Sequence, residues 1–184
     1  MLRLEMDLTE KRLDGELKYK GVIVDVVMDR AQLCDGSVVR REVVRHPGGV
    51  TVLPVDDDGY CYCVRQFRYP LQKLMLEAPA GKLEPGEDPT ECAIRELSEE
   101  TGFTADKLQY LGRCCTSPGI TTEVLHIYLA TGLHAGRSHP DEGEFLSVEK
   151  HHIDELTELA MNGEIDDGKT IIAVLKARQI LNLV

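Results

Sequence analysis

Residues 81–103, GKLEPGEDPTECAIRELSEETGF, bring several carboxylates together on a short stretch of chain. Glu96 is followed by Glu99 and Glu100, which are its i+3 and i+4 neighbours on a helix, so their like charges repel one another. Glu99 and Glu100 also fall in the last helical turn, where the helix dipole disfavours negative charge. A hard divalent cation such as Mg²⁺ prefers oxygen ligands and would offset both costs. The spacing therefore indicates a metal-binding helix face, with a solvated acidic surface as the alternative.

The helix that would carry these glutamates has recognisable residues at both ends. Asp88 suits the N-cap, Pro89 the first helical position, and Gly102 the position just after the last turn. We therefore expect a helix from about Pro89 to about Thr101. At about 100° per residue the glutamates share one face. An adjoining face is expected to pack on the core through Ala93, Ile94, Leu97 and Thr101.

The elements that must position this helix are mostly short strands. Residues 18–48 contain two or three segments rich in β-branched residues, with Asp35-Gly36 as a hairpin turn. Residues 49–70 repeat this pattern, with an Asp-rich turn that ends at Gly59 and an alternating strand after it. Further strands are expected at residues 76–83, 108–115 and 121–133, with a loop, TSPGI, before the last of them.

Two helices are expected at the C-terminal end, in residues 151–165 and 166–184. The second has apolar residues at helical spacing, for example Ile171, Ile172, Leu175 and Ile180. Strands followed by helices favour an α+β fold. We expect an α/β/α sandwich in which a mixed β-sheet is flanked by helices and preceded by antiparallel strands.

Composition excludes several classes of partner. The formal net charge of -11 argues against a long nucleic acid, whose binding depends on Lys and Arg. The charged start of the chain has no apolar run like that of a signal peptide, and no stretch approaches the length of a membrane span. We therefore expect a cytoplasmic protein that binds no membrane. Its six cysteines have no zinc-site spacing and are expected to be reduced and mostly buried.

The complete pattern of residues 81–103 resembles that of the Nudix hydrolases. The matching positions are Gly81, Glu87, Arg95-Glu96-Leu97, Glu99-Glu100 and Gly102-Phe103. The resemblance implies a Nudix fold and an enzyme that uses water and Mg²⁺, or Mn²⁺, to cleave a nucleoside diphosphate linked to another group. An acidic protein can bind such an anion because the bound cation inverts the local charge.

The resemblance also implies roles for individual residues. Metal ligands would be Glu96 and Glu100, with Glu99 as a ligand or a contact to a metal-bound water, and with the carbonyl of Ala80. Glu87 would be a further ligand or would hold Arg95. Arg95 would orient the glutamates, because its planar fork fits carboxylates.

Other segments resemble the ADP-ribose pyrophosphatase branch of the family: REVVRHPGGVTVLPV, VRQFRYPL, LEAPAGKLEPGE, TSPGITTEVLHIYLA and PDEGEF. The branch has a proline at the position of Pro118 as a marker of ADP-sugar substrates, although an ordinary turn would also contain one. The substrate contacts implied are Arg45, Arg68, Glu77, Pro118 and Gly119. Arg68 would reach a phosphate, and Glu77 would contact the terminal sugar or connect two strands. In PDEGEF, Glu142 is the first candidate and Glu144 the second for the carboxylate that activates water.

The function that this resemblance implies is hydrolysis of ADP-ribose to AMP and ribose 5-phosphate. The alternatives are another nucleoside diphosphate sugar or a nucleoside triphosphate as substrate, or a nucleotide-sugar-binding module without catalysis. Members of the branch are commonly homodimers in which N-terminal strands reach the partner. We therefore expect residues 1–45 to be a strand extension that dimerises and residues 46–184 to be the Nudix hydrolase domain.

Overall fold

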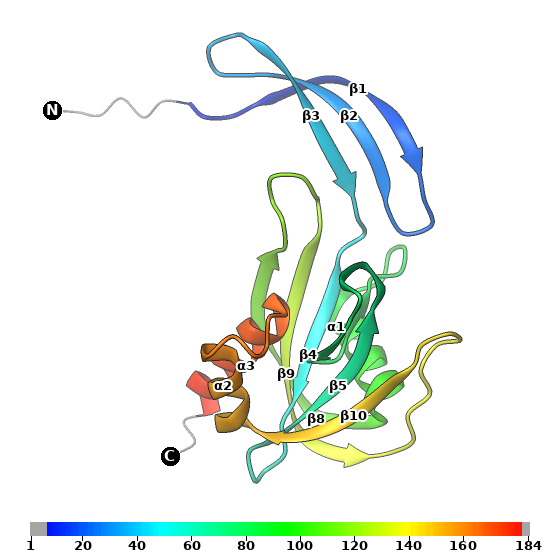
Figure 1. The fold of residues 1–184 in the computed structure, drawn as a ribbon, viewed down its shortest axis with the longest axis vertical. Helices are drawn as coiled ribbons and strands as arrows, with labels where there is room; N and C mark the ends of the chain where they lie inside the picture. The colour runs from blue at the N-terminus through cyan, green and yellow to red at the C-terminus, as the bar shows by residue number, and fades with distance from the viewer. Residues whose placement is uncertain (1–6, 182–184) are drawn as a thin grey trace, which may run out of the picture. The chain divides into compact units, whose positions relative to one another are not determined.

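The computed structural model describes residues 7–181, which form two compact units (Figure 1). The first unit contains the described residues up to Pro47 together with Ser117–Glu123. The second contains Gly48–Thr116 and the described residues from Val124 onward. The ends of the two expected domains, residues 1–6 and 182–184, lie outside the described residues. The role of residues 1–45 in dimerisation stays a prediction.

The first unit is built on three antiparallel strands, in the order β1-β2-β3: β1 (Lys11–Lys20), β2 (Asp25–Gln32) and β3 (Val38–Arg45). The hairpin turn predicted at Asp35-Gly36 is confirmed, since Gly36 lies between β2 and β3 with a φ of 87°. However, β1 begins well before residue 18, where the first strand was expected. The whole of β1 is exposed, so it has no alternation of buried apolar residues by which to recognise it.

The second unit contains two sheets, one mixed and one antiparallel. The mixed sheet has the order β7-β4-β9-β8, in which β4 and β9 are parallel: β4 (Gly49–Pro54), β7 (Ala80–Lys82), β8 (Phe103–Cys115) and β9 (Val124–Ala135). The antiparallel sheet has the order β10-β5-β6: β5 (Tyr60–Arg68), β6 (Lys73–Glu77) and β10 (Leu146–His152). A short 3₁₀ turn, η1 (Tyr69–Leu71), connects β5 to β6. The expected mixed sheet is therefore present, with a second sheet beside it in the same unit.

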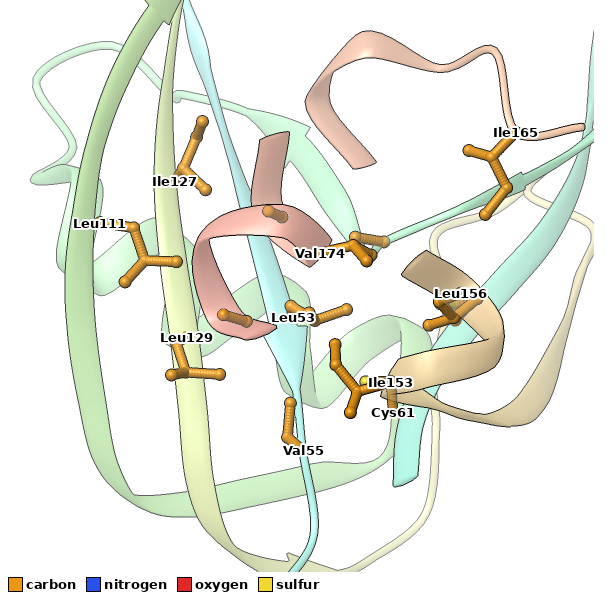
Figure 2. Close-up of a cluster of buried hydrophobic side chains, with 14 residues drawn as sticks. Leu53, Val55, Cys61, Leu111, Ile127, Leu129, Ile153, Leu156, Ile165 and Val174 are labelled. Atoms are coloured by element: carbon orange, nitrogen blue, oxygen red, sulfur yellow. The ribbon is translucent and has the colours of Figure 1, made fainter. Parts of the chain in front are cut away.

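Helices cover both faces of the mixed sheet. Alternate residues of a strand point to opposite sides, so one strand can contact both layers of helices. Val50 and Val52 of β4 pack in one cluster with Ala93 and Leu97 from the helical segment α1 (Pro89–Glu96) and η2 (Leu97–Thr101). Other residues of the same strand, Leu53 among them, face the opposite cluster, shown in Figure 2, which includes side chains of α2 (Ile153–Met161) and α3 (Gly168–Leu181). This arrangement confirms the α+β sandwich expected from the sequence.

The C-terminal elements differ from the prediction in two details. His151 and His152 end strand β10, which the sequence analysis missed, and α2 begins only at Ile153. In α3 the buried face consists of Thr170, Ala173, Val174 and Ala177, whereas Ile180 is 42% exposed. Small side chains on the buried face let the helix lie close to the strands, so the large apolar residues sit at its margins. Within residues 7–181, no helix is both long and apolar enough to cross a membrane.

Candidate active site

The helix that carries the glutamates begins and ends where the sequence predicts. The side chain of Asp88 accepts a hydrogen bond from the Thr90 N–H at 2.8 Å, and Pro89 occupies the first turn. Gly102 follows the last turn with a φ of 76°. The final five residues, Leu97–Thr101, form a wider π-helical turn, a feature that is often found at functional sites.

Two of the three clustered glutamates are buried. Glu96 is 8% exposed and Glu100 only 3%, so this face is not a solvated acidic surface. Ala93 and Leu97 are buried as predicted, but the prediction for Ile94 was wrong, since it is 54% exposed. The helix therefore turns its carboxylates inward, where charge is costly, and leaves an apolar residue outside.

Arg95 donates four hydrogen bonds to carboxylate groups at this face. Its Nε and Nη2 atoms donate to the two carboxylate oxygens of Glu87 at 2.9 and 3.1 Å. Its Nη1 donates to Glu96 at 2.7 Å and to Glu99 at 2.8 Å. The hydrogen bonds from Arg95 to Glu87 lower the pKa of Glu87 to about 2. In this structure, then, Glu87 holds Arg95 with a bidentate pair, and Arg95 orients Glu96 and Glu99.

Glu100 and Glu96 lie against the backbone of β7. One oxygen of Glu100 accepts a hydrogen bond from the Ala80 N–H at 3.0 Å. A Cβ atom on Gly81 would lie only 1.7 Å from a carboxylate oxygen of Glu96, so a larger residue would displace that carboxylate. Burial raises the pKa of Glu100 to about 8, and it also raises the pKa of Glu96. Among residues 7–181, no Lys or Arg forms an ion pair with Glu100.

These donors suit a hard divalent cation, which takes carboxylate and carbonyl oxygens. Two buried, adjacent carboxylates with raised pKa values are stabilised further in the charged form by added positive charge. In the part of the chain that the structure describes, no three His, Cys, Asp or Glu side chains already converge as a metal site. Arg95 holds Glu96 and Glu99 instead. The residues fit the cation in kind and burial, and their roles as ligands stay predictions.

A second cluster of charges surrounds Glu77, which is 1% exposed. Arg68 donates to its two oxygens at 2.6 and 2.7 Å, and Lys169 from the start of α3 donates to it as well. Although burial raises the pKa of Glu77, the positive charges of Arg68 and Lys169 hold this pKa below its ordinary value. The structure thus pairs two of the predicted substrate contacts with each other, and it adds Lys169, which the sequence analysis missed. The sequence contained one signal for this cluster. Asp167 lies three residues before Thr170, and an Asp at this place marks the start of the apolar helix.

The loop with the two candidate bases follows β9 and contacts the end of the glutamate helix. The His139 N–H donates to the Glu99 carbonyl at 2.8 Å, and a Cβ on Gly136 would lie 2.6 Å from the Gly102 carbonyl oxygen. Further on, Glu144 is exposed, and its charge is among the causes that raise the pKa of Glu96 and Glu100. This interaction favours Glu144 as the base, and the choice between Glu142 and Glu144 stays open.

Three other predicted contacts belong to the first unit. Arg45 is the last residue of β3. Pro118 and Gly119 form a turn in which the Ile120 N–H donates to the Ser117 carbonyl at 3.0 Å. That turn attaches to β3, since the Val44 N–H donates to the Ile120 carbonyl at 2.7 Å. The structure brings these residues into one unit, and their roles toward a substrate stay predictions.

The sandwich, the capped acidic helix and the buried glutamates define a member of a known class: this chain belongs to the NUDIX family, whose domain model matches residues 45–173. The resemblance noted in the sequence is thereby confirmed. A relative from Bacillus subtilis (strain 168), named ADP-ribose pyrophosphatase, is 40% identical over 169 residues, which is 91% of each chain. A methanol dehydrogenase activator from Bacillus methanolicus is 40% identical over 167 residues, 90% of each chain. The crystal structure of an ADP compounds hydrolase superposes with a TM-score of 0.82 at 22% identity over 94% of each chain, which shows the shared fold.

Proposed function

We propose that this protein is a divalent-cation-dependent pyrophosphohydrolase that cleaves ADP-ribose to AMP and ribose 5-phosphate. The observation that carries the chemistry is the pair of buried carboxylates, Glu96 and Glu100, against the backbone of Ala80 and Gly81. The substrate is supported by the ADP-ribose pyrophosphatase that is 40% identical over 91% of this chain. We name Mg²⁺ as the cation, with Mn²⁺ as a substitute, because both take oxygen ligands.

In this proposal Glu96, Glu100 and the Ala80 carbonyl hold the cation, with Glu99 as a further ligand or a contact to its water. The cation supplies positive charge that neutralises the diphosphate and lowers the pKa of water. Arg95 keeps the glutamates oriented, and Glu87 holds Arg95 in turn.

Two further groups of residues act on water and substrate. Glu144, or Glu142 in its place, accepts the proton of the attacking water. Arg68 binds a substrate phosphate through Nη1, the nitrogen atom it does not use for Glu77, or by exchanging Glu77 for the phosphate. Arg45, Glu77, Pro118 and Gly119 complete the predicted set of substrate contacts.

Product analysis tests the proposal. The purified protein is assayed with ADP-ribose, GDP-mannose and a nucleoside triphosphate, with Mg²⁺, with Mn²⁺ and with EDTA. We expect AMP and ribose 5-phosphate from ADP-ribose at a much higher kcat/KM than for the other substrates, and no turnover in EDTA. A higher kcat/KM for GDP-mannose or the triphosphate assigns a different substrate. Binding of ADP-ribose without turnover identifies a binding module.

We also propose that the protein is a homodimer formed through the first unit. Strand β1 is exposed throughout and presents Leu13, Leu17 and Tyr19, which are 42%, 50% and 61% exposed. Exposed apolar residues on an edge strand are typical of a surface that pairs with another chain. Sedimentation equilibrium should give the mass of a dimer, and Leu17→Glu should shift it toward the monomer. A monomer at all concentrations contradicts this part of the proposal.

We infer a cytoplasmic location from the cysteines. All six are free thiols, and Cys61, Cys63 and Cys92 are buried. Free thiols are typical of a reducing compartment. Fractionation of cells that express the full chain, followed by immunodetection, tests the inference.

A further inference from the structure

The short segment Glu77–Ala80, between β6 and β7, is held at every residue. Arg68 and Lys169 hold the Glu77 side chain. The Ala78 N–H donates to the Thr170 hydroxyl at 2.7 Å. The Pro79 carbonyl accepts hydrogen bonds from the Val52 N–H at 2.9 Å and the Thr51 hydroxyl at 3.1 Å. Finally, the Ala80 N–H donates to Glu100 at 3.0 Å, so this segment leads directly to the buried carboxylate.

Two of these bonds come from the start of α3, which is far away in the sequence. Asp167 organises them: it accepts from the Lys169 ammonium at 2.9 Å, from the Thr170 N–H at 3.1 Å and from the Thr170 hydroxyl at 2.5 Å. A hydroxyl has a single proton to donate. Because Thr170 gives that proton to Asp167, its oxygen is left to accept from Ala78.

The docking of α3 does not need this polar end. Ala173, Val174 and Ala177 are fully buried in the apolar cluster and hold the helix on the sheet. By contrast, Lys169 has a side chain only 11% exposed, and Thr170 is fully buried. Burying polar and charged groups costs free energy that apolar residues would avoid, so their placement calls for a role in fixing geometry.

We propose that Asp167, Lys169 and Thr170, here called the α3 clamp, are positioning residues for the divalent-cation site. The clamp fixes Glu77 and Ala78, and thereby the Ala80 backbone that faces Glu100. The proposal rests on the proposed function to the extent that Glu100 and the Ala80 carbonyl hold the cation. The clamp acts through the backbone, since its own hydrogen bonds end at Glu77 and Ala78.

Substitutions at Thr170 distinguish a role in positioning the cation site from a role in the stability of the fold. Thr170→Val keeps the shape but leaves the Ala78 N–H without its acceptor, whereas Thr170→Ser keeps the hydroxyl. Mn²⁺ binding is measured by the electron paramagnetic resonance signal of free Mn²⁺, on protein without substrate. We expect Thr170→Val to weaken Mn²⁺ binding by about 10- to 100-fold, in the range of other residues that orient metal ligands, and Thr170→Ser to bind nearly as the wild type does. In the assay, Thr170→Val should raise the cation concentration needed for half-maximal rate more than it lowers kcat.

Two lysines of the same helix provide a matched pair for the case in which Thr170→Val does not fold. Lys169→Met removes a clamp residue. Lys176→Met removes a lysine that donates to the Leu111 carbonyl at 2.6 Å and has no bond to the segment Glu77–Ala80. Both variants should unfold at lower temperature, but only Lys169→Met should weaken Mn²⁺ binding.

The outcomes distinguish the clamp from the function. Unchanged Mn²⁺ binding in Thr170→Val and Lys169→Met, or equal weakening in Lys176→Met, overturns the clamp while the proposed function stands. Mn²⁺ binding that weakens as expected, in a protein that does not cleave ADP-ribose, supports the clamp and removes the proposed function. A wild-type protein that binds no Mn²⁺ overturns the clamp.

Discussion

Two buried glutamates in the second unit have opposite surroundings. Glu77 is 1% exposed and is paired with both Arg68 and Lys169. Glu100 is 3% exposed, and it accepts a hydrogen bond from a neutral group, the Ala80 N–H. Accordingly, the pKa of Glu77 lies below its ordinary value, whereas burial raises that of Glu100 to about 8.

This difference separates a carboxylate that is neutralised by cationic side chains of the protein from one that has no such ion pair. The protein supplies the positive charge for Glu77 from its own side chains, so that carboxylate can be ionised in every state of the molecule. Glu100 has no such ion pair among residues 7–181, and in the proposed function a bound cation supplies the compensating charge. The predictions below test this contrast, beginning with the largest expected effect.

Glu100→Gln should lower kcat by about 10³-fold, because a bound cation contributes several kcal/mol to the transition state. In EDTA the same variant should be more stable than the wild type, since folding no longer buries a carboxyl group that is ionised in the unfolded chain. Steady-state kinetics and thermal unfolding measure the two effects. Glu91→Gln, an exposed position of the same helix, is the control and should change neither. An unchanged kcat in Glu100→Gln contradicts its role.

Glu77→Gln should lower the stability of the protein, in contrast to Glu100→Gln in EDTA. It removes the counter-charge of Arg68 and one of the two carboxylates that hold Lys169, and breaking a buried ion pair in this way costs about 3 kcal/mol of unfolding free energy. Urea unfolding with and without Mg²⁺ measures the loss. If Glu77→Gln were as stable as the wild type, the contrast between the two glutamates would be lost.

Arg95→Lys should weaken the oriented face without removing its charge. A lysine cannot form the bidentate pair with Glu87 while it also contacts Glu96 and Glu99. We expect activity at limiting Mg²⁺ to fall by about 10- to 100-fold, with part of the loss recovered at high Mg²⁺. Rates measured over a series of Mg²⁺ concentrations show this. A variant with wild-type cation dependence would show that Arg95 does not orient the ligands.

A further prediction concerns the pH dependence of stability. The folded-state pKa of Glu100 is raised from 4.5 to about 8. The stability that Glu100 contributes is therefore fully present below the unfolded-state pKa of 4.5 and is lost as the pH rises through about 8. In EDTA, the unfolding temperature should therefore decline between these two values, relative to Glu100→Gln. Mg²⁺ binds the ionised form and should reduce the decline. Parallel curves for both proteins in EDTA would contradict the raised pKa.

The sequence was sufficient for those features that short segments determine. The caps at Asp88 and Gly102, the hairpin at Asp35-Gly36 and the class of fold all follow from local residue preferences and spacing. Ile94 was misplaced because the π-helical turn and the inward-facing glutamates depend on the strands beneath the helix. The start of strand β1 was placed too late because an exposed edge strand has no buried face to mark it.

The charge cluster around Glu77 could not be predicted in the same way. Lys169 and Glu77 are 92 residues apart, and nothing in either local segment names the other as its partner. The glutamates that we propose as metal ligands could be singled out because they lie on one helix. The part of the site assembled from distant segments required the fold.

The close approach of Gly102 and Gly136 limits how the chain length can vary. A Cβ on Gly136 would lie 2.6 Å from the Gly102 carbonyl oxygen, and a Cβ on Gly102 would lie 2.6 Å from the Ser138 nitrogen. Together with the His139–Glu99 hydrogen bond, this fixes the spacing of residues 136–139. Insertions or deletions there would break the contact, whereas those after His139 would alter only the reach of the loop. An engineer who wishes to accommodate a larger substrate should therefore change loop length after His139.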